Sequence, residues 1–103
     1  MAPAPWRVRF TPLADADVSE AYDAYEGERE GLGEEFLEDV GRAVLFVGEH
    51  PEGGPAVHRD LRRVLLHRFP YSLYYRLDRA ERVVEVRACV HQRRHSRAWR
   101  RRA

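Results

Sequence analysis

The hydrophobic pattern changes its period once along the chain. Between residues 13 and 50 apolar side chains recur every three or four positions, which is typical of helices. Beyond residue 55 they recur at every second position, which is typical of strands. The segment 51–55 separates the two regions, because its prolines and glycines favour neither structure. The pattern predicts a helical region followed by a sheet.

The helical region follows a short predicted strand. Residues 6–10 alternate apolar and charged side chains, and Thr11 followed by Pro12 is a typical helix start. Threonine can accept a hydrogen bond from a free amide of the first turn, and proline needs no amide there. Glycines within 27–33 interrupt the helical pattern, and a second apolar stripe covers 36–47. We therefore predict two helices that form a hairpin.

The second half predicts an antiparallel meander. Three strands are expected at 64–69, 71–77 and 83–90, with a turn at 78–82 between the last two. The resulting fold is α+β, with the two-helix hairpin packed on one face of a largely antiparallel four-stranded sheet, in the order β-α-α-β-β-β. The length fits one domain over residues 1–103.

Alternation along the last two strands predicts which side chains face the helices. The helix-facing set is Tyr71, Leu73, Tyr75, Leu77, Val84, Val86, Ala88 and Val90. The opposite face would carry Ser72, Tyr74, Arg76, Glu85, Arg87, Cys89 and His91, with Arg68 added if Phe69 points inward. Ser96 could begin a last short helix that docks through Trp99, leaving residues 100–102 as a solvated tail.

Charge is segregated along the chain. Residues 1–60 hold fourteen acidic side chains against five arginines, and residues 61–103 hold thirteen arginines against three acidic side chains. The two parts therefore carry −9 and +10. A region this basic attracts polyanions or acidic proteins, so we expect the functional site on an open cationic face of the sheet. Acidic residues of the second helix, Asp39 among them, are predicted to lie on the helix surface.

No cofactor, metal or membrane segment is expected. Cys89 is the only cysteine, which excludes an intrachain disulfide and a thiolate zinc site. His91 and His95 are four residues apart, but no helix is predicted across them and no further ligand lies nearby. The longest apolar run, 43–47, is far too short to span a bilayer, and residues 1–5 lack the features of a signal peptide. A cytoplasmic location is therefore expected.

Two motifs resemble those of a known superfamily. The stretch 68–76 reads RFPYSLYYR, and His91-Gln-Arg-Arg94 follows the last strand and precedes Trp99. Together with the order of elements, they resemble the RelE/ParE superfamily of bacterial type II toxin–antitoxin toxins, in its ParE-like branch. The resemblance implies a growth-inhibiting toxin linked to plasmid stabilization. A co-expressed antitoxin would neutralise it by wrapping a C-terminal segment around it, in a toxin–antitoxin hetero-oligomer.

The superfamily implies two alternative targets. ParE-like toxins stall DNA gyrase, whereas RelE-like toxins cut mRNA on the ribosome and need converging acid, base and cationic groups. Ser72 stands where the nuclease branch commonly has an arginine, and Gln92 and Arg93 stand where it commonly has a His-Tyr or Tyr element. These departures favour the gyrase target. If the chain were a nuclease, its catalytic groups would be Arg68, Arg76, Arg87 and His91.

The same reasoning gives a candidate binding set for the antitoxin or the target. Its members are the basic and aromatic residues of the outer face and the following turn, namely Arg68, Tyr74, Arg76, Arg87, His91, Arg93 and Arg94. A third possibility is a family member without toxicity that binds an antitoxin and nothing else.

Overall fold

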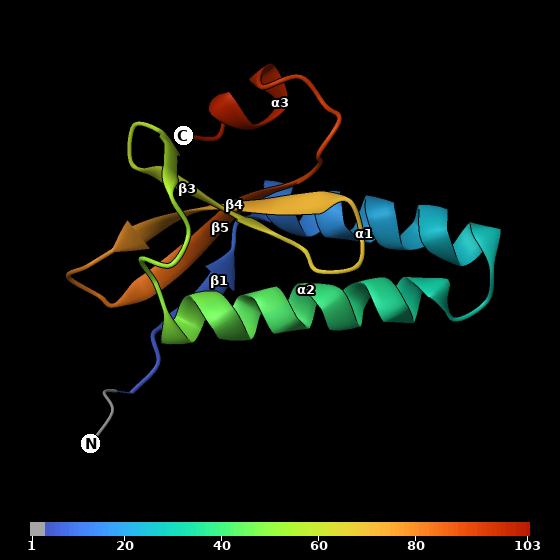
Figure 1. The fold of residues 1–103 in the computed structure, drawn as a ribbon, viewed down its shortest axis with the longest axis horizontal. Helices are drawn as coiled ribbons and strands as arrows, with labels where there is room; N and C mark the ends of the chain where they lie inside the picture. The colour runs from blue at the N-terminus through green and yellow to red at the C-terminus, as the bar shows by residue number, and fades with distance from the viewer. Residues whose placement is uncertain (1–3) are drawn as a thin grey trace.

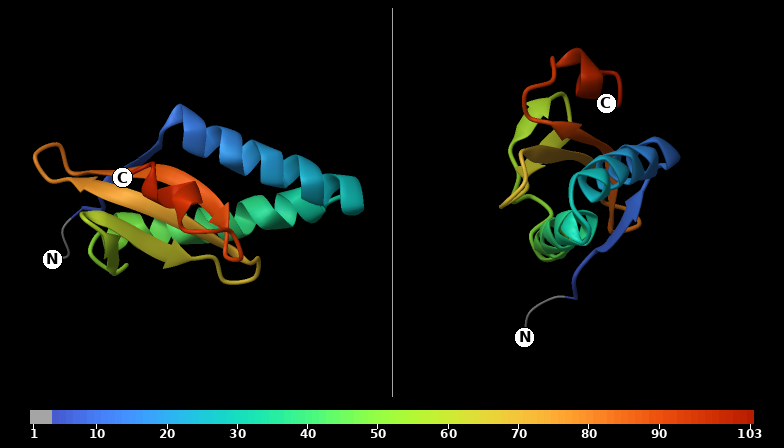
Figure 2. Two further views of the ribbon diagram at one scale, coloured as in Figure 1. Left: turned by 90° about the horizontal axis from the view of Figure 1, so that it is seen from above. Right: turned by 90° about the vertical axis from the view of Figure 1, so that its right-hand side faces the viewer.

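The computed structural model describes residues 4–103 (Figure 1). Residues 1–3, part of the segment 1–5 that was considered above for signal-peptide features, lie outside that range. Its elements, in chain order, are β1 (Arg7–Phe10), α1 (Pro12–Glu28), α2 (Leu32–Glu49), β2 (Ala56–His58), β3 (Leu61–Leu65), β4 (Tyr71–Asp78), β5 (Val83–His91) and α3 (Arg97–Arg100). The α1–α2 hairpin covers one face of the sheet, and α3 lies over the other (Figures 1 and 2).

The sheet has five strands in the order β1-β5-β4-β3-β2. The sheet is mixed: strand β1 runs parallel to β5, and the predicted antiparallel pairing holds for β2 to β5. The prediction of four strands is wrong, because β2 is a three-residue strand and is too short to show an alternating pattern. Strand β3 was also misplaced: it begins at Leu61 and ends at Leu65 rather than extending over 64–69.

The helical hairpin forms for the local reasons that the sequence suggested. Thr11 Oγ1 accepts a hydrogen bond from the Ala14 amide at 3.2 Å, and proline occupies the first position of α1. Gly31 adopts the left-handed region with φ of 88°, which favours glycine. The carboxylate of Glu26 accepts hydrogen bonds from the amides of Gly31 and Gly33 at 3.0 and 2.9 Å. These contacts fix the turn between α1 and α2.

The core between the hairpin and the sheet is rich in aromatic rings. Phe36 of α2 is fully buried and packs edge-on against Phe69 and Tyr71, with ring centroids 5.5 and 5.3 Å apart. Tyr25 of α1 packs against the same group, 4.8 Å from Phe69. Tilted and edge-to-face arrangements are favourable for aromatic pairs beyond the area that they bury. This cluster holds the hairpin on β4 and β5.

A β-bulge in β5 overturns part of the predicted facing. Tyr74 pairs with Ala88 and Tyr75 with Val86, so Arg87 is an extra residue on β5. The side chains of Ala88 and Val90 therefore point away from the hairpin, contrary to the prediction. Cys89 and His91 were expected on the outer face. Cys89 is instead buried in the helix-side core, and His91 pairs with the helix-facing Tyr71.

The outer face has a smaller core of its own. Trp99 of α3 stacks on Tyr74, with ring centroids 4.7 Å apart and an interplanar angle of 10°. Leu61, Ala88 and Val90 are buried in the same cluster. The prediction of a short helix docked through Trp99 is therefore confirmed.

Candidate functional site

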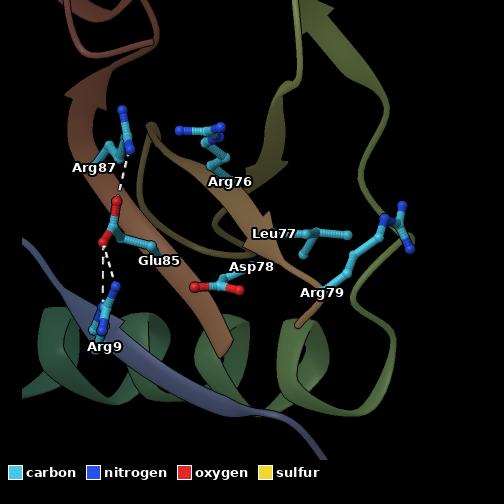
Figure 3. A pocket seen from close by; sticks show the side chains of 7 residues that line it. All are labelled: Arg9, Arg76, Leu77, Asp78, Arg79, Glu85 and Arg87. Atoms are coloured by element: carbon cyan, nitrogen blue, oxygen red, sulfur yellow. Dashed lines mark hydrogen bonds and ion pairs between the residues drawn. The ribbon is translucent and has the colours of Figure 1, made fainter. Parts of the chain in front are cut away.

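A polar hollow of about 490 Å³ lies on the outer face of the sheet, beside the region that α3 covers (Figure 3). Strands β1, β5 and β4 and the β4–β5 turn supply its walls. The lining residues are Arg9, Arg76, Leu77, Asp78, Arg79, Glu85 and Arg87. Four guanidinium groups thus surround two carboxylates. Strand arginines from both parts of the chain, Arg9 on one side and Arg76 and Arg87 on the other, thus line one pocket.

Glu85 is the centre of the hollow. Its Oε2 accepts hydrogen bonds from Arg9 Nε and Nη2 at 3.2 and 2.8 Å, and its Oε1 accepts one from Arg87 Nε at 2.8 Å. Partial burial alone would raise the pKa of Glu85, but the hydrogen bonds from the two arginines outweigh it and lower that pKa. Glu85 is therefore ionised at neutral pH and holds both guanidinium groups in place, as Figure 3 shows.

The other two arginines of the hollow pair with carboxylates at its rim. Arg76 Nε lies 2.7 Å from Asp60 Oδ2, and Arg79 Nη1 lies 2.6 Å from Glu52 Oε1. The expectation of an open cationic face is therefore wrong, because the protein's own carboxylates neutralise these arginines. The rim pairs are well exposed, with side-chain exposures of 61% for Asp60 and 62% for Glu52. Such pairs are weak and exchange readily with other carboxylates.

Arg68 lies away from the hollow. It was expected on the outer face, but it sits in the β3–β4 connection, where its Nη2 is 3.0 Å from Glu35 Oε1 of α2. Its guanidinium also lies over the Phe69 ring, 5.5 Å from the centroid. Phe69 does point inward as expected. Arg68 nevertheless faces the helices, because β3 ends at Leu65 and the connection turns toward α2.

His91 and Arg94 line a different depression. It has a volume of about 150 Å³ and lies between α1, the end of β5 and the following turn, with Glu20 and Tyr71 also in its wall. The imidazole ring of His91 lies 5.2 Å from the Tyr71 ring, and its Nδ1 accepts a hydrogen bond from the Arg93 amide at 3.1 Å. These residues therefore face the acidic α1 helix rather than the outer hollow.

Tyr74 and Ser72 do point to the outer face, but both are covered. Tyr74 is 4% exposed beneath Trp99, and Ser72 is 1% exposed. Tyr74 therefore offers no free ring for stacking on a base or a partner side chain.

Sequence reasoning missed four functional or structural groups. Arg9 could have been found, since alternation in the first strand puts it on the face opposite Val8 and Phe10. Arg79 gave no pattern, because it lies in a turn. Asp17 and Arg102 form an ion pair at 2.9 Å, so the expectation of a solvated tail at residues 100–102 is wrong for Arg102.

Asp39 was also misjudged. It was predicted on the helix surface, but it is 1% exposed and accepts hydrogen bonds from the backbone amides of His67, Arg68 and Phe69 at 3.2, 2.8 and 2.9 Å. Burial opposes ionisation, but these three bonds outweigh it and lower the pKa of Asp39. The carboxylate thus fixes the β3–β4 connection to α2. An acidic residue in a helical acidic run gave no signal of this role.

Metal-ligating residue types and the single thiol are further candidates for chemistry. Within residues 4–103 no group of three or more histidine, cysteine, aspartate or glutamate residues is arranged to hold a metal ion. Burial raises the pKa of the Cys89 thiol to about 12, so it is not a thiolate nucleophile at neutral pH. None of the helices in the described residues has the length and apolar character needed to cross a bilayer.

The chain was compared with family models, curated sequences and solved structures. A family model described as the ParE toxin of the type II toxin–antitoxin system parDE matches residues 8–96. A search of curated protein sequences finds no match. The fold is similar to the chromosomal ParDE toxin–antitoxin system from P. aeruginosa, with a TM-score of 0.68 and 21% identity over 84% of this chain and 95% of that chain. It is also similar to the toxin–antitoxin complex RelBE2 from Mycobacterium tuberculosis, with a TM-score of 0.63 and 23% identity over 84% and 98%.

Proposed function

Because the chain belongs to the family of ParE toxins of type II toxin–antitoxin systems, we propose that it inhibits DNA gyrase in the cytoplasm and that a co-expressed antitoxin neutralises it. The toxin and its antitoxin would form a hetero-oligomer. The family match over residues 8–96 carries this proposal.

The geometry supports gyrase over mRNA cleavage as the target. A ribonuclease needs its base, its acid and its phosphate-binding cations around one scissile bond. The four candidate groups do not converge in this way. Arg76 and Arg87 line the outer hollow, His91 lines the depression beside α1, and Arg68 pairs with α2. No histidine lines the outer hollow, where Arg76 and Arg87 lie.

A supercoiling assay tests the proposed activity. Purified toxin added to gyrase, relaxed plasmid and ATP should inhibit supercoiling or leave cleaved plasmid after protein denaturation. Addition of the cognate antitoxin should restore supercoiling. Unimpaired supercoiling at a large molar excess of toxin would contradict the proposal.

The outer hollow is the proposed contact for an acidic segment of the antitoxin or the target. A partner carboxylate can replace Asp60 on Arg76 or Glu52 on Arg79, because both rim pairs are exposed and weak. Charge reversal of Arg76 and Arg87 should therefore weaken antitoxin binding measured by surface plasmon resonance. A control variant reverses Arg7, an exposed arginine on β1 outside the hollow lining, and is compared with the single reversals of Arg76 and Arg87. Equal affinity of the hollow variant and the wild type would exclude this surface.

Similarity to the RelBE2 complex keeps ribosome-dependent mRNA cleavage as a second candidate. Primer extension on mRNA from cells that express the toxin distinguishes the two activities. Cuts within codons, together with unaffected gyrase, would establish the nuclease. The third candidate is a family member without toxicity, and unimpaired growth on induction without antitoxin would establish it.

A further inference from the structure

Positive charge without an ion-pair partner gathers on the helix α3 and at its C-terminal cap, although the Arg100 guanidinium also lies over the Trp99 ring, 5.6 Å from its centroid. Arg97, Arg100 and Arg101 are exposed, and none of them forms an ion pair within residues 4–103. Their spacing of three and four residues puts them on one side of a helical turn. We call these three residues the α3 ridge. They differ from the arginines of the outer hollow, which are already neutralised.

The opposite side of the same turn is anchored to the sheet. Trp99 and Arg102 fall on that side, and Ala98 and Ala103 pack against the outer core there. Trp99 is 9% exposed and stacked on Tyr74. The three exposed arginines therefore stand on a fixed support, with the Arg100 guanidinium 5.6 Å from the centroid of the Trp99 ring.

The anchor includes a reciprocal exchange of hydrogen bonds with the bulge in β5. Arg102 Nη1 donates to the carbonyl oxygen of Arg87 at 2.9 Å, and Arg87 Nη1 donates to the carbonyl oxygen of Arg102 at 3.1 Å. Arg102 Nη1 also lies 2.9 Å from Asp17 Oδ2 of α1. A ridge held at both Trp99 and Arg102 loses less conformational entropy on binding than three arginines on a free tail would.

From this arrangement we infer that the α3 ridge binds the phosphate backbone of duplex DNA. Guanidinium groups are planar and bind phosphate oxygens in a bidentate manner. Three of them on one helical turn give a short cationic surface that carries no acidic residue. Such contacts are independent of base sequence and add non-specific affinity. This binding goes beyond the proposed inhibition of gyrase and does not depend on it.

Two other classes of partner fit the ridge less well. Single strands are bound by stacking bases on exposed aromatic rings, and the one aromatic residue of α3, Trp99, is occupied by Tyr74. Peptides need pockets for anchor side chains. The depression beside the ridge has a volume of only about 150 Å³ and is lined by both acidic and basic side chains, so it offers no strongly cationic pocket for an acidic peptide.

Fluorescence anisotropy with a labelled 20-base-pair duplex tests the inference. At physiological salt the full-length toxin should bind with a dissociation constant in the range of about 10⁻⁴ to 10⁻⁶ M, and more tightly as the salt concentration is lowered. Three phosphate contacts predict a slope of about −2.7 in a plot of log K against log salt concentration. The variant R97Q/R100Q/R101Q should bind at least about tenfold more weakly and show a flatter slope.

The matched control removes three exposed arginines elsewhere that likewise form no ion pair within residues 4–103, as R7Q/R59N/R82N. These positions lie on β1, between β2 and β3, and in the β4–β5 turn, so the net charge changes equally while the ridge stays intact. Asparagine is used at Arg59 and Arg82 because both residues have a φ of 55°. The control should bind within about twofold of wild type, and circular dichroism should show both variants folded.

Three outcomes would overturn the inference. The first is no binding of the wild-type protein at 50 mM salt, and the second is an equal loss of affinity in the ridge and control variants. The third is tighter binding of poly-glutamate than of duplex at equal charge concentration, which would identify an acidic protein as the partner. All three are independent of the supercoiling assay.

Discussion

The two faces of the sheet are covered in different ways. The helix-side face is covered by two helices of 17 and 18 residues, with a continuous aromatic and aliphatic core. The outer face is covered by the four-residue helix α3, which buries a cluster around Trp99 and leaves a polar hollow beside it. The first face provides the stability of the fold, and the second provides room for polar groups that can exchange partners.

This difference has a physical reason in the bulge of β5. By adding Arg87, the bulge puts Arg87 and Ala88 on the outer face in succession. Residues before it, such as Glu85, face the hollow, and residues after it, such as Val90, face α3. One strand therefore supplies both a polar and an apolar half of the same face.

Phe36→Ala should be the most damaging substitution. It removes the centre of the helix-side aromatic cluster, and a change of this kind costs about 4 kcal/mol of unfolding free energy. Thermal or chemical denaturation followed by circular dichroism measures the loss. Leu45→Ala, at a residue of α2 that is 66% exposed, is the control and should change stability little. Similar losses in both variants would contradict the role given to this core.

Trp99→Ala should have the next largest effect, about 3 kcal/mol, because it removes the stack on Tyr74 and opens the outer core. The loss of local stability should be concentrated on the outer face. Hydrogen exchange should therefore accelerate more in β3 and β4 than in α1, and Trp99→Phe should retain most of the stability. Equal acceleration in α1 would show that the two faces do not differ in the way described.

Asp39→Asn should destabilise the protein by about 2 kcal/mol at neutral pH, because it replaces charge-assisted hydrogen bonds to three amides. The pKa of Asp39 is lowered by folding, so its contribution is present above the unfolded pKa of about 3.9 and is lost as pH falls through the folded pKa. Urea denaturation at a series of pH values should show the two proteins converging below about pH 4. A constant difference down to pH 2 would contradict this assignment.

Glu85→Gln should have the smallest effect on stability, about 1 kcal/mol or less, since its partner Arg9 is well exposed and its less exposed partner Arg87 keeps a hydrogen bond to the Arg102 carbonyl. The loss should shrink further in high salt, because screening weakens such pairs. A larger effect on antitoxin affinity than on melting temperature would place the hollow among binding surfaces rather than among stabilising ones.

The sequence was sufficient for most of the fold because its periodicity follows from burial. The amphipathic hairpin, the cap at Thr11 and the strands β4 and β5 all leave local patterns. Strand β2 and the start of β3 leave none, because the first has three residues and the second contains Arg62 and Arg63. Local pattern is weak where a strand is short or half-buried.

The site was harder to predict because it depends on contacts between distant residues. The alternation from Val84 to Val90 gives no sign of the bulge, and one extra residue reverses the facing of everything after Arg87. The neutralisation of Arg76 depends on Asp60, sixteen residues away, which the sequence does not pair with it. The net charge of residues 61–103 predicted that arginines would gather on the outer face of the sheet. It did not predict which of them would remain unpaired.

Because the two tryptophans lie in different layers, the fluorescence of each one reports on its own layer. Trp6 lies beside the hairpin, with the Arg82 guanidinium 5.9 Å from its ring, whereas Trp99 lies under no part of the hairpin and rests on Tyr74. A W6F protein would therefore report spectroscopically on the α3 side alone, and a W99F protein on the hairpin side alone. A ligand that settles on one layer would change one spectrum and leave the other as it was.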